Sequence, residues 1–243
     1  MKRFLLVVAI LVLLGYLAFI AFYFKDNLQE KVCENFIVLI KDSFDKEFIQ
    51  TKDIEDLLRK EKLHPVKKLI ADINTMEMEK AILGNKLVKS VEVYSTHDGS
   101  IVASIRQRNP VMRVISHKDG SYYIDNERQR MPLSQHYTVY LPVATGFISE
   151  EYAKNELYDF VMFISNSPTW DAWIEQIVVT QNQKVQLVPR AGDFKVTLGT
   201  LEDYEKKLNN LKVFIDKGLN KVGWNRYSEV NLEYNNQVVC TMK

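Results

Sequence analysis

Residues 4–24 form a run of twenty-one residues without a charged side chain, and this run constrains the fold more than any other feature. At 1.5 Å per residue, a helix over this run would be ~31 Å long, about the hydrocarbon thickness of a bilayer. A cleaved signal peptide has a shorter apolar region followed by an A-x-A-like site, which is not found here. We therefore predict an uncleaved transmembrane signal anchor over residues 4–24.

The charges at the N-terminus predict the orientation of this anchor. Lys2 and Arg3 precede it, so the positive-inside rule places residues 1–3 in the cytoplasm as a short tail and exports the remainder. Residues 25–243 contain 30 basic and 31 acidic residues. Because phosphate binding needs clustered Lys and Arg, this balance gives no support to a nucleic-acid partner.

The two cysteines, Cys33 and Cys240, lie near opposite ends of the exported part. They do not form the spaced set that is typical of a disulfide framework. We expect both to be packed or chemically inert.

The first exported segment, residues 25–108, predicts a small domain with the element order β-α-α-β-β. Apolar β-branched residues predict the first strand, and i, i+3, i+4 apolar spacing predicts the helices, which Thr51 and Asn74 would cap. Period-2 alternation on both sides of a turn predicts the hairpin. These elements fall at residues 35–41, 51–65, 74–84, 91–94 and 101–105.

Residues 109–243 predict a mixed α/β domain that is rich in strands. Short β-branched segments between Gly, Pro and polar turns indicate strands at 111–116, 122–125, 138–144, 174–181, 184–189 and 194–198. Two helices are predicted over residues 150–165 and 200–219, with Ser149 and Thr200 as their caps. The fold class is therefore α+β: one N-terminal transmembrane helix, a small β-α-α-β-β domain and a mixed α/β domain.

The chain closes with a predicted hairpin. Val230, Leu232 and Tyr234 alternate with polar residues, Asn235 and Asn236 suit a tight turn, and residues 237–242 read as a second strand. A terminal strand of this kind is either an edge that recruits another chain or an ordinary edge protected by Lys243.

No motif for catalysis or metal binding is visible. The four histidines are widely separated and lack an HExxH pattern, and the nine glycines include neither a P-loop nor a Gly-x-Ser-x-Gly elbow. We predict no catalytic residue, no metal ligand, no cofactor and no small-molecule substrate.

Three stretches resemble one family. They are SIRQRNPVMRV at 104–114, YYIDNERQRMPLS at 122–134 and LPVATG at 141–146. Their order is similar to that of the bacterial cell-division family FtsQ, also called DivIB. The resemblance covers essentially the whole chain and implies a POTRA domain followed by the family's β domain.

Two positions depart from the family pattern. Arg128 stands three residues after Asp125, where the family often has Gly, so the turn there is expected to differ in type. Gln107 stands where Glu is common.

The resemblance implies a non-enzymatic divisome scaffold of the inner membrane at the division septum, with its C-terminal region in the periplasm. Its partners would be FtsB and FtsL, and through them FtsW and FtsI in septal peptidoglycan synthesis. FtsB would add a strand to the last strand of the β domain. The implied partner-binding residues are Tyr234, Gln237, Val238, Val239, Cys240 and Thr241.

Some alternatives remain open from the sequence. Tyr234 is either a partner-facing anchor or a core residue of the hairpin, and its alternation with Leu232 favours the core. Arg106 and Arg113 lie near the domain junction and could contact a partner or belong to solvated strand faces. The rival functions are a membrane-anchored POTRA chaperone or secretion component and a cell-wall enzyme.

Overall fold

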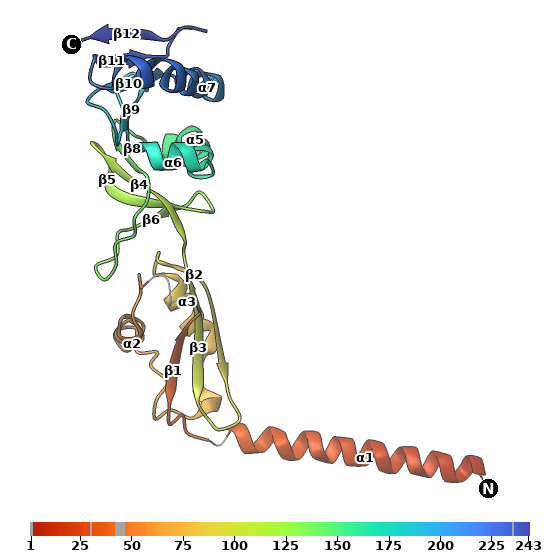
Figure 1. Ribbon diagram of the computed structural model, residues 1–243. Helices are drawn as coiled ribbons and strands as arrows, with labels where there is room; N and C mark the ends of the chain where they lie inside the picture. Colours follow the sequence, from red (N-terminus) through yellow and green to blue (C-terminus); the bar gives the residue numbers. More distant parts are fainter. Residues whose placement is uncertain (1, 30, 42–46, 235) are drawn as a thin grey trace. The chain divides into compact units, whose positions relative to one another are not determined.

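The computed structural model describes residues 2–29, 31–41, 47–234 and 236–243, without the side chains of 2–6, 21–29 and 222. The chain divides into two compact units, Met1–Gln107 and Arg108–Lys243. Helix α1 spans Lys2–Gln29 and covers the predicted anchor (Figure 1). A search restricted to the described residues finds no helix with both the length and the apolar character needed to cross a bilayer.

The first unit has the predicted β-α-α-β-β order around a three-stranded sheet. The sheet order is β1-β3-β2, with β1 parallel and β2 antiparallel to the central β3. Helix α2 packs against β1, and α3 packs against β2. The elements are β1 Phe36–Ile40, α2 Thr51–Lys60, the short 3-10 helix η1 Ile70–Asp72, α3 Thr75–Leu83, β2 Val88–Ser95 and β3 Ile101–Gln107.

Helix caps fix where these two helices begin. The Glu77 N–H donates to Asn74 Oδ1 at 3.1 Å, which confirms the predicted cap of α3. The predicted cap of α2 is wrong by one residue, because Gln50 is the N-cap and forms a capping box with Asp53. The Gln50 N–H donates to Asp53 Oδ2 at 2.8 Å.

The neutral Gln107 has a structural partner. Its side chain is buried, and its Oε1 atom accepts a hydrogen bond from the Ile49 N–H at 2.9 Å. An amide supplies this acceptor without the desolvation penalty that burial would impose on a carboxylate.

The second unit is built on one nine-stranded mixed sheet, in the order β12-β11-β10-β9-β8-β7-β4-β5-β6. Its strands are β4 Pro110–Ser116, β5 Gly120–Asp125, β6 Arg130–Met131, β7 Val143–Gly146, β8 Ile174–Val179, β9 Val185–Pro189, β10 Lys195–Gly199, β11 Tyr227–Asn231 and β12 Val239–Met242.

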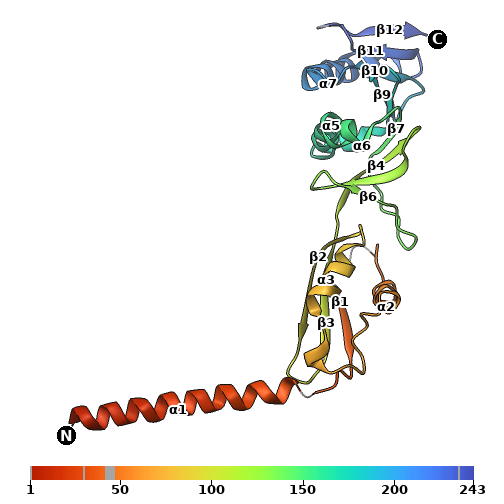
Figure 2. The ribbon, with the colours of Figure 1, turned by 180° about the vertical axis from the view of Figure 1, so that it is seen from behind.

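Helices cover one face of this sheet. In Figures 1 and 2, which view the unit from opposite sides, α5, α6 and α7 lie on the same side of the strands. Buried side chains from helices and strands form one core, to which Phe160, Val161, Leu187, Val196 and Leu208 belong. The helices are α4 Glu150–Lys154, α5 Glu156–Ser165, α6 Pro168–Trp173, α7 Tyr204–Phe214, the π-helix η2 Ile215–Leu219 and α8 Asn220–Val222.

The predicted helix over 150–165 is two helices. The chain leaves helical geometry at Asn155, where φ is −111° and ψ is −99°. The Glu151 carbonyl accepts both the Asn155 N–H and the Asn155 side-chain amide, each at 3.1 Å, so Asn155 caps the end of α4. Pro168 begins the additional helix α6, where its missing N–H is tolerated at the first turn.

The predicted helix over 200–219 begins later than expected. Asp203, not Thr200, is the N-cap of α7, and its φ of +52° lies in the left-handed region. After Phe214 the helix widens into the π-helix η2. There, a Cβ atom on Gly218 would lie 3.0 Å from the Phe214 ring, so any larger residue would have to displace this ring by a few tenths of an ångström.

The predicted strand over 138–144 is also shorter, because β7 begins only at Val143. Pro142 has no N–H to donate to a strand on either side, which disfavours continuation of a central strand through it. Its carbonyl accepts the Arg113 N–H at 3.0 Å, and the preceding residues leave the sheet.

Candidate functional site: the exposed sheet edge

Strand β12 lies at one edge of the nine-stranded sheet, as the sequence predicts for the chain's last strand (Figure 1). It pairs antiparallel with β11, which in turn pairs parallel with β10. Within the described parts of the chain, no other strand pairs with β12. The strand covers Val239–Met242, so Gln237 and Val238 precede it instead of belonging to it.

A tight turn leads into this strand. The Gln237 N–H donates to the Tyr234 carbonyl at 3.2 Å, and Asn236 has a φ of +58°, a left-handed conformation that Asn tolerates. Asn235, the other predicted turn residue, lies outside the described residues.

The backbone of β12 presents specific groups to the open edge. The Lys243 N–H donates to the Arg226 carbonyl at 3.2 Å, so the main-chain groups of Lys243 point toward the β11 side. Backbone direction alternates along a strand, so those of Val239 and Thr241 point the same way. The N–H and C=O groups of Cys240 and the N–H of Met242 therefore point away from β11, toward the open edge, whereas the Met242 carbonyl accepts a hydrogen bond from the Ser228 hydroxyl of β11 at 3.4 Å.

The pairing of β11 gives the same assignment independently. The Leu232 N–H donates to the Thr197 carbonyl of β10 at 2.8 Å, so Val230 also directs its main-chain groups toward β10. Its neighbour Asn231 then faces β12, opposite Val239.

The predicted site residues divide by exposure. Val238 and Cys240 pack against the core, whereas Gln237, Val239 and Thr241 are exposed. The sequence-based preference for Tyr234 as a core residue is wrong, because its side chain is 58 % exposed. It lies beyond the last buried position of the hairpin, Leu232.

Met242 lies in the same strand but is not among the binding residues that the sequence predicts. It is 59 % exposed and lies at the end of β12 opposite Tyr227. The alternating pattern had marked it only as the last residue of the strand, but an exposed methionine beside an open edge suits an adaptable binding surface.

Both cysteines are free thiols. Burial raises the pKa of the Cys33 thiol and that of the partly buried Cys240 thiol. A raised pKa keeps a thiol protonated and therefore a poor nucleophile.

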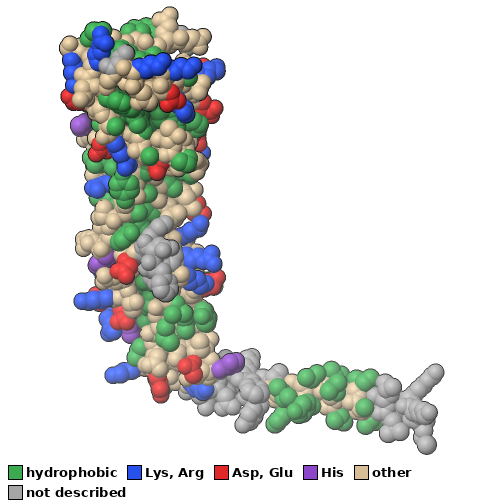
Figure 3. Space-filling model, in the orientation of Figure 1, with side chains coloured by type: hydrophobic (Ala, Val, Ile, Leu, Met, Phe, Trp, Pro, Cys, Tyr) green, Lys and Arg blue, Asp and Glu red, His purple; other side chains and the backbone are tan. Residues whose placement is uncertain are grey.

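The positive charge of Lys243, beside the β12 edge, is neutralised within the protein. Its Nζ atom pairs with Asp193 Oδ2 at 2.7 Å, and this partner lowers the pKa of the Asp193 carboxyl. By contrast, Lys217, Lys221 and Arg226 form no ion pair with any described residue. Figure 3 shows Lys and Arg side chains gathered over the end of the unit that contains β12.

Ion pairs cover the strand face opposite the helices. Lys195 Nζ lies 3.6 Å from Glu229 Oε2, and Glu229 also accepts a hydrogen bond from the Thr197 hydroxyl. The Lys184 ammonium lies 2.8 Å from Glu233 Oε1 and lowers the pKa of that carboxyl. The polar face beside the edge is thus largely self-paired.

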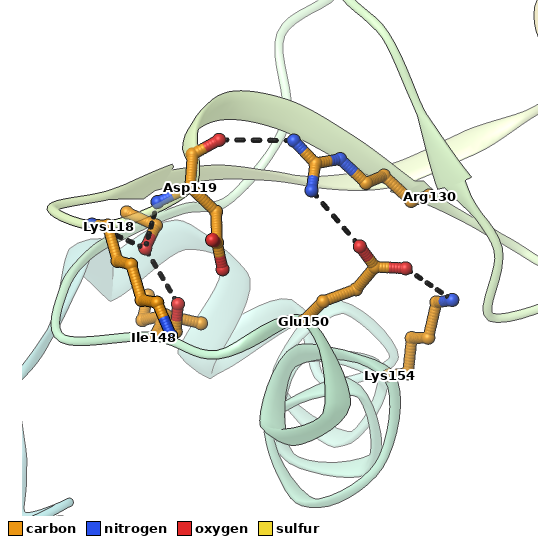
Figure 4. Close-up of polar contacts among 7 residues, drawn as sticks. Lys118, Asp119, Arg130, Ile148, Glu150 and Lys154 are labelled. Atoms are coloured by element: carbon orange, nitrogen blue, oxygen red, sulfur yellow. Dashed lines mark hydrogen bonds and ion pairs between the residues drawn. The ribbon is translucent and has the colours of Figure 1, made fainter.

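The strand at the opposite edge of the sheet, β6, is held to its neighbours by side-chain contacts. Arg130 of β6 donates to the Asp119 carbonyl at 3.1 Å and to Glu150 Oε2 at 3.0 Å (Figure 4). Its guanidinium carbon also lies 4.3 Å from the Tyr122 ring centroid. Glu150 also pairs with Lys154 at 2.6 Å; these two cations, Lys154 foremost, lower the pKa of the Glu150 carboxyl. β6 is therefore tied to α4, unlike β12.

The departure at Arg128 has a structural explanation. Arg128 has a φ of +60°, so this turn keeps the left-handed conformation for which glycine is common. Its guanidinium donates to the Lys154 carbonyl and to Asp159, and it stacks on the Tyr158 ring at 4.2 Å. These contacts join the turn to α4 and α5 and compensate for the strained backbone.

No metal centre is found in the described ranges, where no three His, Cys, Asp or Glu side chains gather as possible ligands.

The chain matches two family models. Residues 109–241, more than half of the chain, match the family described as "FtsQ/DivIB, C-terminal related", and residues 31–106 match a POTRA-like domain. Comparison with curated proteins finds no match. The chain therefore belongs to the FtsQ/DivIB family of cell-division proteins, with a POTRA-like domain ahead of the family's C-terminal domain.

Proposed function

We propose that this chain is a single-span divisome scaffold that captures FtsB, together with FtsL, by strand addition at β12. Through these partners it helps to control septal peptidoglycan synthesis by FtsW and FtsI. The observation that carries the proposal is the position of β12 at the edge of the sheet, where one side of its backbone pairs with no described strand.

The chemistry of strand addition fits this edge. An added strand gains affinity from main-chain hydrogen bonds, and specificity comes from the side chains beside them. Cys240 presents one N–H and one C=O group and Met242 presents its N–H, a short ladder that another extended segment can continue. Edges that proteins keep closed carry bulges, prolines or inward charges, and β12 itself contains neither proline nor a charged residue.

Side chains near the edge favour a particular kind of partner. Tyr234, Val239 and Met242 offer exposed apolar surface, and exposed aromatic residues often supply much of the energy of an interface. Arg226 and the nearby lysines of η2 and α8 carry positive charge that no described residue neutralises. A partner segment with apolar residues and a few acidic residues complements this surface.

The membrane attachment in this proposal rests on the sequence. Residues 4–24 carry no charge, lie within α1 and follow two basic residues. The scaffold would thus cross the inner membrane once, with residues 1–3 in the cytoplasm and residues 25–243 in the periplasm at the septum.

Photocrosslinking in dividing cells tests the proposal. A photoreactive amino acid at Thr241, which is exposed on β12, is expected to crosslink to FtsB. The same amino acid at Lys118, exposed in the β4–β5 turn of the same unit, is the matched control and should not crosslink to FtsB. Equal crosslinking from the two positions, or none from Thr241, would contradict capture at this edge.

A further inference from the structure

A second surface of the C-terminal unit has the features of a binding site and is separate in the sheet order from the β12 edge. In the sheet, β7 lies between β4 and β8, with Val143 opposite both Arg113 and Gln176. Residues 139–142 before β7 are not in a strand. The first residues of β4 and β8 therefore have no strand between them, and a slot opens there.

We call this pocket the β4–β8 slot. It has a volume of about 590 Å³, within the roughly 300–1,000 Å³ that is typical of ligand sites. Its walls come from both strands, from the segment before β7 and from α5 and α6. Among its apolar lining residues are Val111, Leu141, Pro142, Met162 and Ile174.

An arginine without a partner lies in this apolar wall. The Nε atom of Arg113 is buried and has no hydrogen-bond partner, and its guanidinium forms no ion pair with a described residue. A buried donor without an acceptor is unfavourable by about 1–3 kcal/mol. Arg113 also lines the slot, so its guanidinium charge favours a ligand that brings a carboxylate.

The rim adds charges of both signs. Arg190 lies with its guanidinium carbon 5.4 Å from the Tyr140 ring centroid, and the Tyr140 side chain is 79 % exposed. Asp171 and Glu175 also line the slot and form no ion pair with the described residues. Two carboxylates at the rim disfavour an anionic lipid headgroup, whereas a peptide offers N–H donors to them as well as a carboxylate to Arg113.

We infer that the β4–β8 slot binds a short peptide segment of a protein partner in which an acidic side chain lies between apolar residues. The acidic side chain of the peptide pairs with Arg113, and its apolar neighbours in the peptide pack between β4 and β8. Tyr140 and Arg190 contact the peptide at the rim. This binding does not depend on strand addition at β12.

Selection from a library of random twelve-residue peptides displayed on phage tests this inference. The bait is the full chain in lipid nanodiscs, and only peptides that also bind the Cys240→Pro variant, which lacks the outward N–H of β12, are retained, so that peptides that bind at the β12 edge are removed. We expect enrichment of Asp or Glu flanked by apolar residues. The absence of acidic enrichment would overturn the inference.

The most enriched peptide is then measured against matched variants. Arg113→Gln should weaken its binding by about tenfold or more, the effect of losing a charge-assisted hydrogen bond, and Glu→Gln in the peptide should do the same. Arg106→Gln, at an exposed strand arginine in the other unit, should leave binding unchanged.

Two further measurements keep the test decisive. Tyr140→Ser alters an exposed rim residue, so it should weaken binding without lowering the melting temperature. Soluble dioctanoyl-phosphatidylglycerol should not displace the peptide. Displacement by this lipid, or binding that survives Arg113→Gln in a variant with an unchanged circular dichroism spectrum, would overturn the assignment.

Discussion

Arg108 Nη1 donates a hydrogen bond to Asp125 Oδ2 at 2.7 Å, which joins the first residue of the C-terminal unit to the end of β5. The other carboxylate oxygen of Asp125 accepts the N–H groups of Glu127 and Gln129 at 2.9 and 2.7 Å. Asp125 is buried, so this one side chain satisfies three donors in a place that water does not reach. Asp125, in the YYIDNERQRMPLS stretch that resembles the family, thus has a structural role.

Replacing Asp125 should therefore destabilise the C-terminal unit. Asp125→Ala leaves a partly buried guanidinium and two N–H groups without acceptors, and should lower the free energy of unfolding by about 3 kcal/mol. Asp125→Asn keeps one acceptor oxygen, so its free energy of unfolding should fall by less than that of Asp125→Ala. Tryptophan fluorescence during urea unfolding reports on this unit, because Trp170, Trp173 and Trp224 all lie in it. The exposed Glu151→Ala is the control, and an equal loss in both Ala variants would refute this role.

The turn at Arg128 should reveal its backbone strain through a pair of variants. Arg128→Gly and Arg128→Ala both remove the guanidinium contacts, but only glycine adopts the φ of +60° without a steric penalty. We expect the Ala variant to melt about 5 °C below the Gly variant, as a difference of 1–2 kcal/mol implies for a unit of this size. Identical melting temperatures would show that the turn relaxes to another conformation.

The ion pairs of Glu150 should make the free energy of unfolding of the C-terminal unit depend on pH. Its folded pKa lies below the ordinary value of 4.5, chiefly because of Lys154 and then Arg130. A carboxyl group whose pKa is lower in the folded than in the unfolded protein stabilises the fold at a pH above its unfolded pKa. This contribution is lost as the pH falls through its pKa in the folded protein. Glu150→Gln should therefore be less stable than the native chain at pH 7, with the gap narrowing below about pH 4.5. Unfolding at pH 7 and pH 3 checks this, and a gap independent of pH would refute it.

Much of the fold follows from local sequence signals. The apolar stripes of α2 and α5 each reflect one buried face, and β4 alternates between buried and less buried positions, which is why local patterns predict these elements. Two predicted boundaries were wrong because of single residues. The helix predicted over 150–165 is interrupted at Asn155, whose side chain caps α4 through the Glu151 carbonyl. The strand predicted over 138–144 begins only at Val143, after Pro142, which has no N–H to donate to a neighbouring strand.

The site was predictable only in part, for a physical reason. The sequence predicts the hairpin of β11 and β12, and the position of β12 at the edge comes from the order of the sheet. Which of its backbone groups face outward depends on registers with β10 and β11, which are long-range relationships. The same holds for Tyr234, whose alternation resembled a core position although it lies just beyond the strand.

Tyr234 should matter for binding and not for stability. Because its side chain is 58 % exposed, Tyr234→Ala should change the free energy of unfolding by no more than about 0.5 kcal/mol. The same change should weaken capture of the periplasmic segment of FtsB by about tenfold, as truncation of an aromatic interface anchor does. Calorimetric titration measures the affinity. A Tyr234→Ala variant that is destabilised but binds FtsB with unchanged affinity would show that Tyr234 stabilises the fold and does not bind the partner.

The most direct test of the account is a proline at Cys240, compared with Cys240→Val. Proline removes the outward N–H of Cys240 and leaves the groups that Val239 and Thr241 direct toward β11, whereas valine keeps the N–H and changes only the side chain. We predict that both full-chain variants melt alike, that Cys240→Val still binds the FtsB segment, and that Cys240→Pro binds it roughly tenfold or more weakly. Equal affinities of two folded variants would contradict strand addition at β12.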